Sequence, residues 1–495
     1  MPFFEPDNYI YFIFAKLAIA AHTLNPTALT NPYLLGAPHG FFESPGLFVL
    51  PALLTMLTGI PLVWSFRIWQ GLAVIVIYSM TLLFTKKVLD SIPISPIYTY
   101  FTYTLITGNF LLMQYTQIIE WRGTEFVEAI ALVMAYLLAT ALSVKSNVRR
   151  LLLSAAILLC TLGALWMWSG GFVVPIALGI TLLGLLVYSK FLSKSAWIWK
   201  YVSLGIVVAS ILLFFFYGQI EDWIISITVH FGFAGCIGNV LSLGEVQCLT
   251  PSDGLIAVLM MLVFGTMALS AFLGRTIMSI DKKKYEAYLL TALGMCFALL
   301  PLALIYLRLL SLIAPYLSIF YALGVVAMLS YFNNTGSNKL VLGITMSLIL
   351  LSSFVGQYLF YTAYASLYSY ANPSGLVAIG NYLSSAPNAT VLTFYGYGDW
   401  LESQAHVRVY ADTIQGLQKG ISTDNIFTSP PAQACAKISA LRPVPEYVLL
   451  GGDMNISSVF QKAANSSIAL RPAGFEGACG YTLIKHSRGF YLFKR

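Results

Sequence analysis

Long apolar segments separated by short polar breaks fill most of this 495-residue chain. A membrane-spanning helix needs about 20 predominantly apolar residues, and about ten segments come close to that length. They cover residues 61–85, 95–114, 124–143, 151–168, 172–189, 197–217, 254–274, 287–305, 311–330 and 340–358. The pattern predicts a polytopic α-helical membrane protein.

The pattern changes after residue 358. Turn-forming residues now separate short runs rich in β-branched and aromatic side chains, at 390–394, 447–450 and 481–485. We therefore expect a transmembrane domain over residues 1–358 and an α/β domain over 359–495.

Two long loops belong to the transmembrane domain, residues 1–60 and 218–253. The start of the first loop resembles neither a signal peptide nor a first membrane span. Its apolar run 45–60 predicts a helix lying on the membrane surface.

The charged residues support the prediction of a membrane protein and indicate its orientation in the membrane. Charged residues make up 9% of the chain, against roughly 25% in soluble proteins. Basic residues concentrate on the cytoplasmic side of membrane proteins. Most basic residues of the predicted transmembrane domain fall on one side: Lys86, Lys87, Lys145, Arg149, Arg150, Lys190, Lys194, Lys200, Arg275, Lys282, Lys283, Lys284 and Lys339. The exceptions are Lys16, Arg67, Arg122 and Arg308.

The acidic residues show the opposite bias, so the loops 1–60 and 218–253 and the C-terminal domain are expected on the external face of the cell membrane. The net charge of +7 follows largely from this topology and does not indicate a nucleic-acid partner.

One acidic stretch interrupts the apolar pattern, at residues 117–126. It carries Glu120, Arg122 and Glu125, with Glu128 just beyond. Charge at a bilayer boundary is costly and often marks a functional site. Two or three carboxylates facing one side of the membrane could hold a divalent cation, because hard cations take oxygen ligands. A helix cap followed by a solvated loop is the alternative.

The six cysteines divide between two environments. Cys160 and Cys296 lie in apolar spans, where cysteine usually serves packing. Cys236 and Cys248 share one outer loop, and Cys435 and Cys479 share the C-terminal domain. The two outer pairs are compatible with two disulfides in an oxidising space, with chance pairing as the alternative.

Three further features are candidates for function. Glu245 lies in the outer loop 218–253, where a lone glutamate is commonly just solvated. Arg308 lies at the outer end of a late span and is either functional or extended to the interface. In residues 393–400 aromatic side chains alternate with glycine, which favours a pocket rim or a simple strand–turn–helix junction. The C-terminal domain also holds the sequons at Asn388, Asn455 and Asn465.

The order of these features resembles the catalytic subunit of oligosaccharyltransferases in its archaeal single-subunit form, a GT-C glycosyltransferase. The resemblance spans nearly the whole chain. It comprises EPDNY with Asp7, a Pro/Gly segment leading to a surface helix, EWRGTEF with Glu125, SLGE with Glu245, Arg308 followed by Pro315, and FYGYG at 394–398.

The resemblance implies transfer of an oligosaccharide from a polyprenyl or dolichyl (pyro)phosphate to asparagine in Asn-x-Ser/Thr sequons of an acceptor protein or peptide. It implies Asp7 and Glu245 as catalytic residues, and Asp7 and Glu125 as ligands of Mn²⁺ or Mg²⁺. Glu120 is a further candidate ligand, because Gly123 stands where the family has its first acid.

Arg308 would bind the donor phosphate. The run Phe394, Tyr395, Gly396, Tyr397 and Gly398 would hold the acceptor hydroxyl. The family's Trp-Trp-Asp-Tyr-Gly has an aspartate where this chain has Gly396, although Asp399 follows shortly after.

Two other functions remain open. Another GT-C transferase could move a polyprenyl-phosphate sugar onto a lipid or onto Ser/Thr, and it would need neither the Glu245 loop nor the pocket at 394–398. A transporter or structural membrane protein would show no metal dependence and would carry charge midway along several spans.

Overall fold

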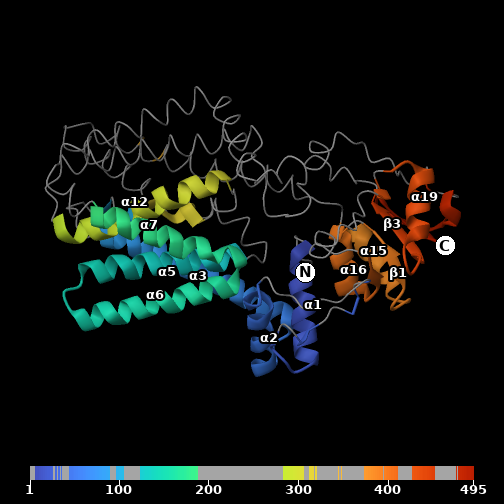
Figure 1. The fold of residues 1–495 in the computed structure, drawn as a ribbon, viewed down its shortest axis with the longest axis horizontal. Helices are drawn as coiled ribbons and strands as arrows, with labels where there is room; N and C mark the ends of the chain where they lie inside the picture. Colours follow the sequence, from blue (N-terminus) through green and yellow to red (C-terminus); the bar gives the residue numbers. More distant parts are fainter. Residues whose placement is uncertain are drawn as a thin grey trace.

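The computed structural model describes residues 6–25, 28–29, 32–33, 35, 44–89, 96–97, 99–104, 123–187, 282–305, 312–316, 318–319, 344, 347, 373–393, 395–410, 426–427, 429–451, 475 and 478–495. Two kinds of structure occupy these residues. A bundle of apolar helices forms one end of the molecule, and a mixed α/β part forms the other (Figure 1).

Among the described residues, five helices form this bundle, and they lie side by side (Figure 1). They are α3 (Leu62–Leu89), α5 (Gly123–Ser143), α6 (Asn147–Met167), α7 (Val173–Val187) and α12 (Lys282–Ile305). Helix α5 packs against the other four. In the part of the chain that the structure describes, α3, α5 and α6 are long and apolar enough to cross a membrane.

Five of the predicted spans therefore correspond to helices. The segments 197–217 and 254–274 lie outside the described residues, and only short pieces of 95–114, 311–330 and 340–358 are described. The predicted domain boundary after residue 358 also lies outside them. The count of about ten spans and this boundary stay predictions.

The two ends of the bundle differ in charge. Helices α5 and α6 are joined by a short turn containing Lys145, and Ser146 caps α6 by accepting from the Arg149 N–H at 3.5 Å. Helix α6 runs from this turn toward α2, and α3 runs away from α2 and ends with Lys86 and Lys87. These basic residues thus lie at the end of the bundle far from α2.

Two short helices cross the other end of the bundle. Helix α2 (Gly46–Thr58) occupies the apolar run predicted to be a surface helix, and Gly59, at a φ of 71°, ends it with an N–H donated to Thr55 O at 2.8 Å. Helix α1 (Pro6–Ala20) was not predicted. It packs against α2 on one side and against the α/β part on the other (Figure 1).

The α/β part is built on a five-stranded mixed sheet in the order β2-β1-β3-β5-β4. The strands are β1 (Thr390–Leu392), β2 (Arg408–Val409), β3 (Tyr447–Gly451), β4 (Thr482–Ser487) and β5 (Phe490–Lys494). β1 runs parallel to β2 and β3, whereas β5 is antiparallel to β3 and β4. The three predicted strand segments are confirmed as β1, β3 and β4.

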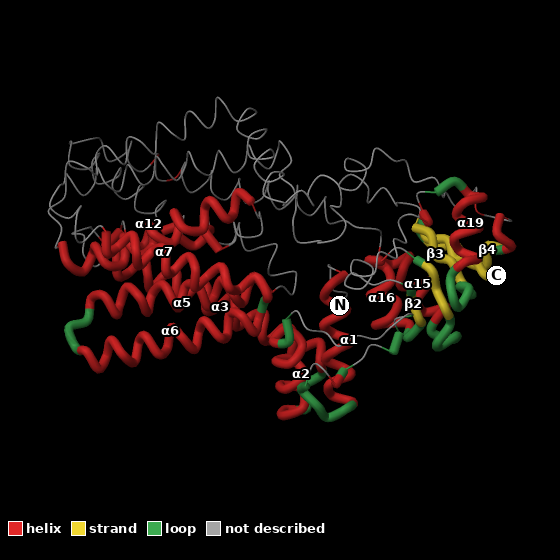
Figure 2. Tube along the Cα trace, viewed as in Figure 1, coloured by secondary structure: helices red, strands yellow, loops and turns green. Residues whose placement is uncertain are grey.

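Helices cover both faces of this sheet (Figure 2). Among the described residues, these helices are α15 (Pro373–Leu383), α16 (Tyr395–Ala405) and α19 (Pro431–Ala440). Successive side chains of a strand point to opposite faces. In β3, Tyr447 and Leu449 accordingly join the core that contains α15 and α16, and Val448 and Leu450 join the core that contains α19.

Candidate functional site

The acidic stretch leads directly into α5, and Glu125 lies in the first turn of that helix. Its side chain is 0% exposed, as is that of Glu128 one turn further along. The bundle end at which α5 begins is also the end that α2 crosses, since Gly46 of α2 and Gly123 of α5 both approach Met167 at the end of α6. The helix places this carboxylate inside the protein rather than in a solvated loop.

The Glu125 carboxylate has no hydrogen-bond partner among the residues that the structure describes. No atom of the described residues donates to either of its two oxygens. A buried carboxylate is costly unless it is paired or coordinates a metal. Buried carboxylate oxygens suit a hard divalent cation, and the donor set therefore fits Mn²⁺ or Mg²⁺. Within the described ranges, no group of three or more His, Cys, Asp or Glu side chains could hold a metal ion.

Helix α1 carries the other predicted metal ligand. Asp7 lies in its first turn, although the side chain of Asp7 lies outside the described part of the structure. The helix is held by buried apolar contacts. The Phe12 ring packs on Phe66 of α3 at a centroid distance of 5.9 Å. The Phe14 ring packs on Phe48 of α2 at 5.8 Å. These contacts fix α1 across the end of the bundle where α5 begins.

Helix α16 contains the run predicted to bind the acceptor hydroxyl. The helix begins at Tyr395, directly after β1. Tyr397 packs against the sheet. Its ring centroid lies 5.2 Å from that of Phe490, and a Cβ on Gly451 would come within 3.2 Å of it, a tight contact. The run thus forms a strand–helix junction in which Tyr397 packs on the sheet, and Phe394 lies outside the described residues.

Helices α1 and α16 pack against each other. At their contact the half-buried Lys16 donates from Nζ to Ser403 O at 3.2 Å, and its ammonium lies 4.8 Å from the Phe12 ring centroid. Burial lowers the pKa of Lys16. Sequence reasoning missed this contact, although Lys16 stood out as a basic residue on the acidic side of the predicted membrane.

A second attachment joins the first outer loop to the sheet. The Val409 N–H donates to Tyr33 O at 2.8 Å, and the Leu35 N–H donates to Val409 O at 2.8 Å. The loop segment therefore continues the sheet beyond β2, and Tyr33 also lies 5.5 Å from the His406 ring. Helix α1 thus contacts α16, and the loop that follows α1 is bonded to β2, the strand that follows α16.

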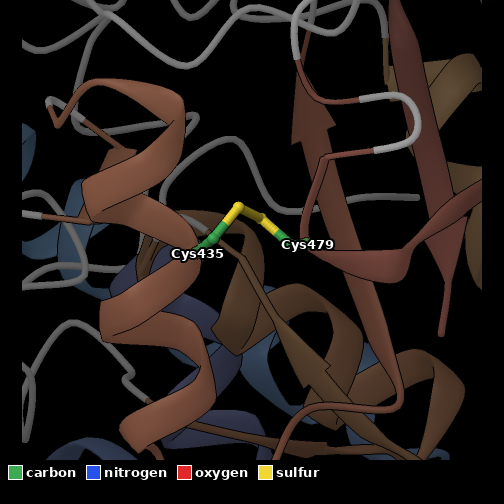
Figure 3. The surroundings of a disulfide bond; sticks show 2 residues. All are labelled: Cys435 and Cys479. Carbon is green, nitrogen blue, oxygen red and sulfur yellow. A yellow bond between two sulfur atoms is a disulfide. The ribbon is translucent and has the colours of Figure 1, made fainter.

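The structure joins the two cysteines of the C-terminal part. Cys435 of α19 and Cys479 of the short 3₁₀ helix η5 (Ala478–Gly480) form a disulfide (Figure 3). This bond fastens α19 to the segment that leads into β4. The other predicted pair, Cys236 and Cys248, lies outside the described residues, and Cys160 and Cys296 are free thiols.

Three further predicted site residues lie in parts of the chain that the structure does not describe. Glu120, Glu245 and Arg308 lie outside the described residues. Asp7 lies on the helix that crosses the bundle end where α5 begins, and this helix also packs on the helix of Tyr395 to Gly398. The roles of all these residues stay predictions.

Solved structures share this architecture. The *Archaeoglobus fulgidus* oligosaccharyltransferase tethered to an acceptor peptide with an NVT sequon matches at a TM-score of 0.58 and 16% identity. The match covers 91% of this chain and 65% of that one, so this chain spans about two thirds of its length. The complex of the same enzyme with Zn and sulfate matches at a TM-score of 0.53 and 14% identity, over 98% of this chain and 69% of that one.

ArnT from *Cupriavidus metallidurans*, bound to undecaprenyl phosphate, matches at a TM-score of 0.53 and 9% identity, over 98% of this chain and 93% of that one. No protein-family model and no curated protein sequence matches the chain. The likeness is one of fold. The chain therefore has the fold of GT-C membrane glycosyltransferases, with a mixed α/β part after the helical bundle.

Proposed function

We propose that the protein is an oligosaccharyltransferase, which moves an oligosaccharide from a polyprenyl or dolichyl (pyro)phosphate to the side-chain amide of asparagine in Asn-x-Ser/Thr sequons. One observation carries the proposal: a fully buried glutamate without hydrogen-bond partners among the described residues lies at the end of the bundle crossed by the helix of Asp7. That helix in turn packs on the helix of the 395–398 run. The bound sequon peptide of the archaeal neighbour supports the same assignment.

In the proposed chemistry, acidic residues bind the cation and a basic residue binds the donor phosphate. Asp7 and Glu125, with Glu120 as a further candidate, would hold Mn²⁺ or Mg²⁺. Bound there, the cation would supply Lewis-acid stabilisation of the charge on the leaving phosphate. Arg308 would neutralise the same phosphate and orient the donor.

Two carboxylates would prepare the acceptor. An amide nitrogen is a weak nucleophile because its lone pair is delocalised into the carbonyl group. Asp7 and Glu245 would accept its two N–H bonds, weaken this delocalisation and aim the lone pair at the sugar. Residues 394–398 would bind the acceptor hydroxyl, and Gly396 leaves that site without the aspartate of the related enzymes.

We place this site and the residues 359–495 on the external face of the membrane. Basic residues lie at the bundle end away from α1 and α2, and basic ends face the cytoplasm. The disulfide between Cys435 and Cys479 supports the same orientation, because disulfides persist in oxidising compartments.

The proposal is tested by transfer in detergent. Purified protein, a lipid-linked oligosaccharide extract from its own source, Mn²⁺ and a labelled peptide containing Asn-Ala-Thr are combined, and the peptide mass is measured. We expect a glycopeptide that is lost with EDTA, with a Gln-Ala-Thr peptide and in Glu245→Ala. Absence of product, with donor and peptide both verified in a known transferase, contradicts the proposal.

A second candidate function is suggested by the likeness to ArnT, whose fold this chain shares at a TM-score of 0.53. A GT-C transferase that moves a polyprenyl-phosphate sugar onto a lipid would not need an aspartate at Gly396. Label transferred to a lipid fraction, and not to the peptide, would support this second candidate.

A further inference from the structure

The acidic stretch before α5 offers no carboxylate at position 123. A Cβ on Gly123 would lie 2.9 Å from Met167 O and 2.9 Å from Trp168 Cβ, closer than real Cβ atoms come. No acidic side chain fits there unless the end of α6 moves. The position at which the related enzymes have their first acid is therefore closed in this protein, and a second carboxylate must come from elsewhere.

Glu128 is placed to supply it. It lies one turn after Glu125 on α5, and both side chains are 0% exposed. Residues three apart on a helix are neighbours on its surface, and the two carboxylates interact electrostatically. Glutamate with a second ligand three residues later is also the spacing by which helical bundles hold metals in their cores.

A tyrosine from a second segment lies near Glu128. Tyr316, 0% exposed, interacts electrostatically with Glu128. The hydroxyl of Tyr316 donates to Ala131 O at 3.3 Å, on the next turn of α5. A second helical segment is thereby fastened to α5 one turn after Glu128, inside the protein.

We propose that Glu128 is the second carboxylate ligand of the cation site formed with Glu125, in place of the acid excluded at Gly123. The inference rests on the metal use in the proposed function. Two buried carboxylates so close together repel each other, and a divalent cation between them offsets that repulsion and the cost of their burial. The Glu125 oxygens, without a hydrogen-bond partner among the described residues, point to the same ligand.

Metal binding, measured apart from transfer, tests the inference. The detergent-purified protein is stripped with EDTA, dialysed and titrated with Mn²⁺, and free Mn²⁺ is followed by electron paramagnetic resonance. The variants are Glu125→Gln, Glu128→Gln and Glu128→Asp. Glu402→Gln is the matched control, because Glu402 is likewise 0% exposed but belongs to α16.

We expect Glu128→Gln to raise the Mn²⁺ Kd by at least about tenfold, the lower bound seen when even supporting groups of metal sites are lost. Glu402→Gln should bind as the wild type does. Wild-type affinity in Glu128→Gln, with affinity lost in Glu125→Gln, overturns the inference and leaves the metal proposal standing. Unchanged affinity in Glu125→Gln overturns the metal proposal itself.

Glu128→Asp keeps the test decisive if the glutamine variant fails to fold. It retains the charge but draws the carboxylate back toward the helix, so its affinity should fall while its unfolding temperature in EDTA stays near that of the wild type. Full wild-type affinity in this variant overturns the inference, because a ligand that must reach the cation does not tolerate the shorter side chain.

Discussion

The sheet and the first turn of α5 both bury polar side chains but pair them differently. In the sheet part, Tyr481 is 1% exposed and its hydroxyl donates to Pro445 O at 2.5 Å. The Thr390 hydroxyl accepts from the Glu446 N–H at 2.9 Å. Glu125 is as deeply buried as Tyr481, yet no described residue donates to it. A buried polar group without a partner costs about 1–3 kcal/mol, and more if charged.

The difference separates structural from functional polar groups. Tyr481 and Thr390 tie loops to the sheet and contribute to the stability of the fold. Glu125 opposes that stability unless something outside the described residues binds it. The comparison therefore predicts that changes in the sheet part alter folding, whereas changes at the start of α5 alter activity.

Replacing Glu125 should have the largest effect. Glu125→Gln is expected to lower the transfer rate about 10²–10³-fold, because it weakens the binding of the cation that would stabilise the developing charge. The unfolding temperature in EDTA should stay equal or rise, since the variant no longer buries an unpaired charge. The exposed Glu446→Gln is the control for both measurements. A large fall in unfolding temperature would instead assign Glu125 a structural role.

Breaking the disulfide should lower the stability of the protein and leave its metal binding unchanged, the reverse of the outcome expected for Glu125→Gln. Cys435→Ser opens a link that spans 44 residues, and disulfides typically stabilise by about 2–4 kcal/mol. Denaturant unfolding should show that loss, while the Mn²⁺ affinity stays unchanged. Cys160→Ser, at a free and half-buried thiol of α6, is the control. Loss of metal affinity in Cys435→Ser would contradict the prediction that changes in the sheet part alter folding alone.

A hydrogen-bonded tyrosine inside the bundle tests whether a buried polar group that has a partner serves only stability. The hydroxyls of Tyr288 and Thr140 share a hydrogen bond of 3.0 Å between α12 and α5. Tyr288→Phe should cost about 1 kcal/mol of stability and leave the transfer rate unchanged. Tyr382→Phe, at a partly exposed tyrosine of α15, should change neither quantity. A loss of transfer in Tyr288→Phe would show that paired polar groups of the bundle also serve the reaction.

The smallest effect is expected where α1 packs on the α/β part. Burial first, and then the charge of Lys16, lower the pKa of His406. The unfolded value is about 6.5, so the unfolded state binds more protons just below that pH. Stability is thus complete above pH 6.5 and is lost as the pH falls toward the folded pKa.

Unfolding temperatures between pH 5 and 7.5 measure this dependence. Both His406→Gln and Lys16→Met should make it shallower, the second only in part because burial remains. Lys494→Met, at another lysine over an aromatic ring, is the control. An unchanged pH profile in His406→Gln would assign the dependence to other groups.

Much of the bundle could be predicted from the sequence, because an apolar helix carries its signal in its own residues. The segment 124–143 corresponds closely to α5, and the strand at 447–450 to β3. Helix α1 escaped prediction, since it is too short for a membrane span and its polar partner, Ser403 of α16, is distant in sequence.

The details of the site were less predictable. The sequence placed Glu125 at a membrane boundary, but its complete burial depends on how α5 packs among neighbouring helices. The closure of position 123 depends on Met167 and Trp168. The run at 394–398 suggested a pocket, and only the packing of Tyr397 against Phe490 shows that one of its aromatic rings belongs to the core.

The hydrogen bonds of Tyr33 and Leu35 to Val409 also constrain how the protein is made. The ribosome releases the first outer loop long before it reaches β2, and the predicted membrane helices are synthesised in between. The loop must therefore wait outside the membrane without its partner strand, and long-range pairing of this kind forms late. The segment that is translated first is thus among the last to acquire its final backbone hydrogen bonds.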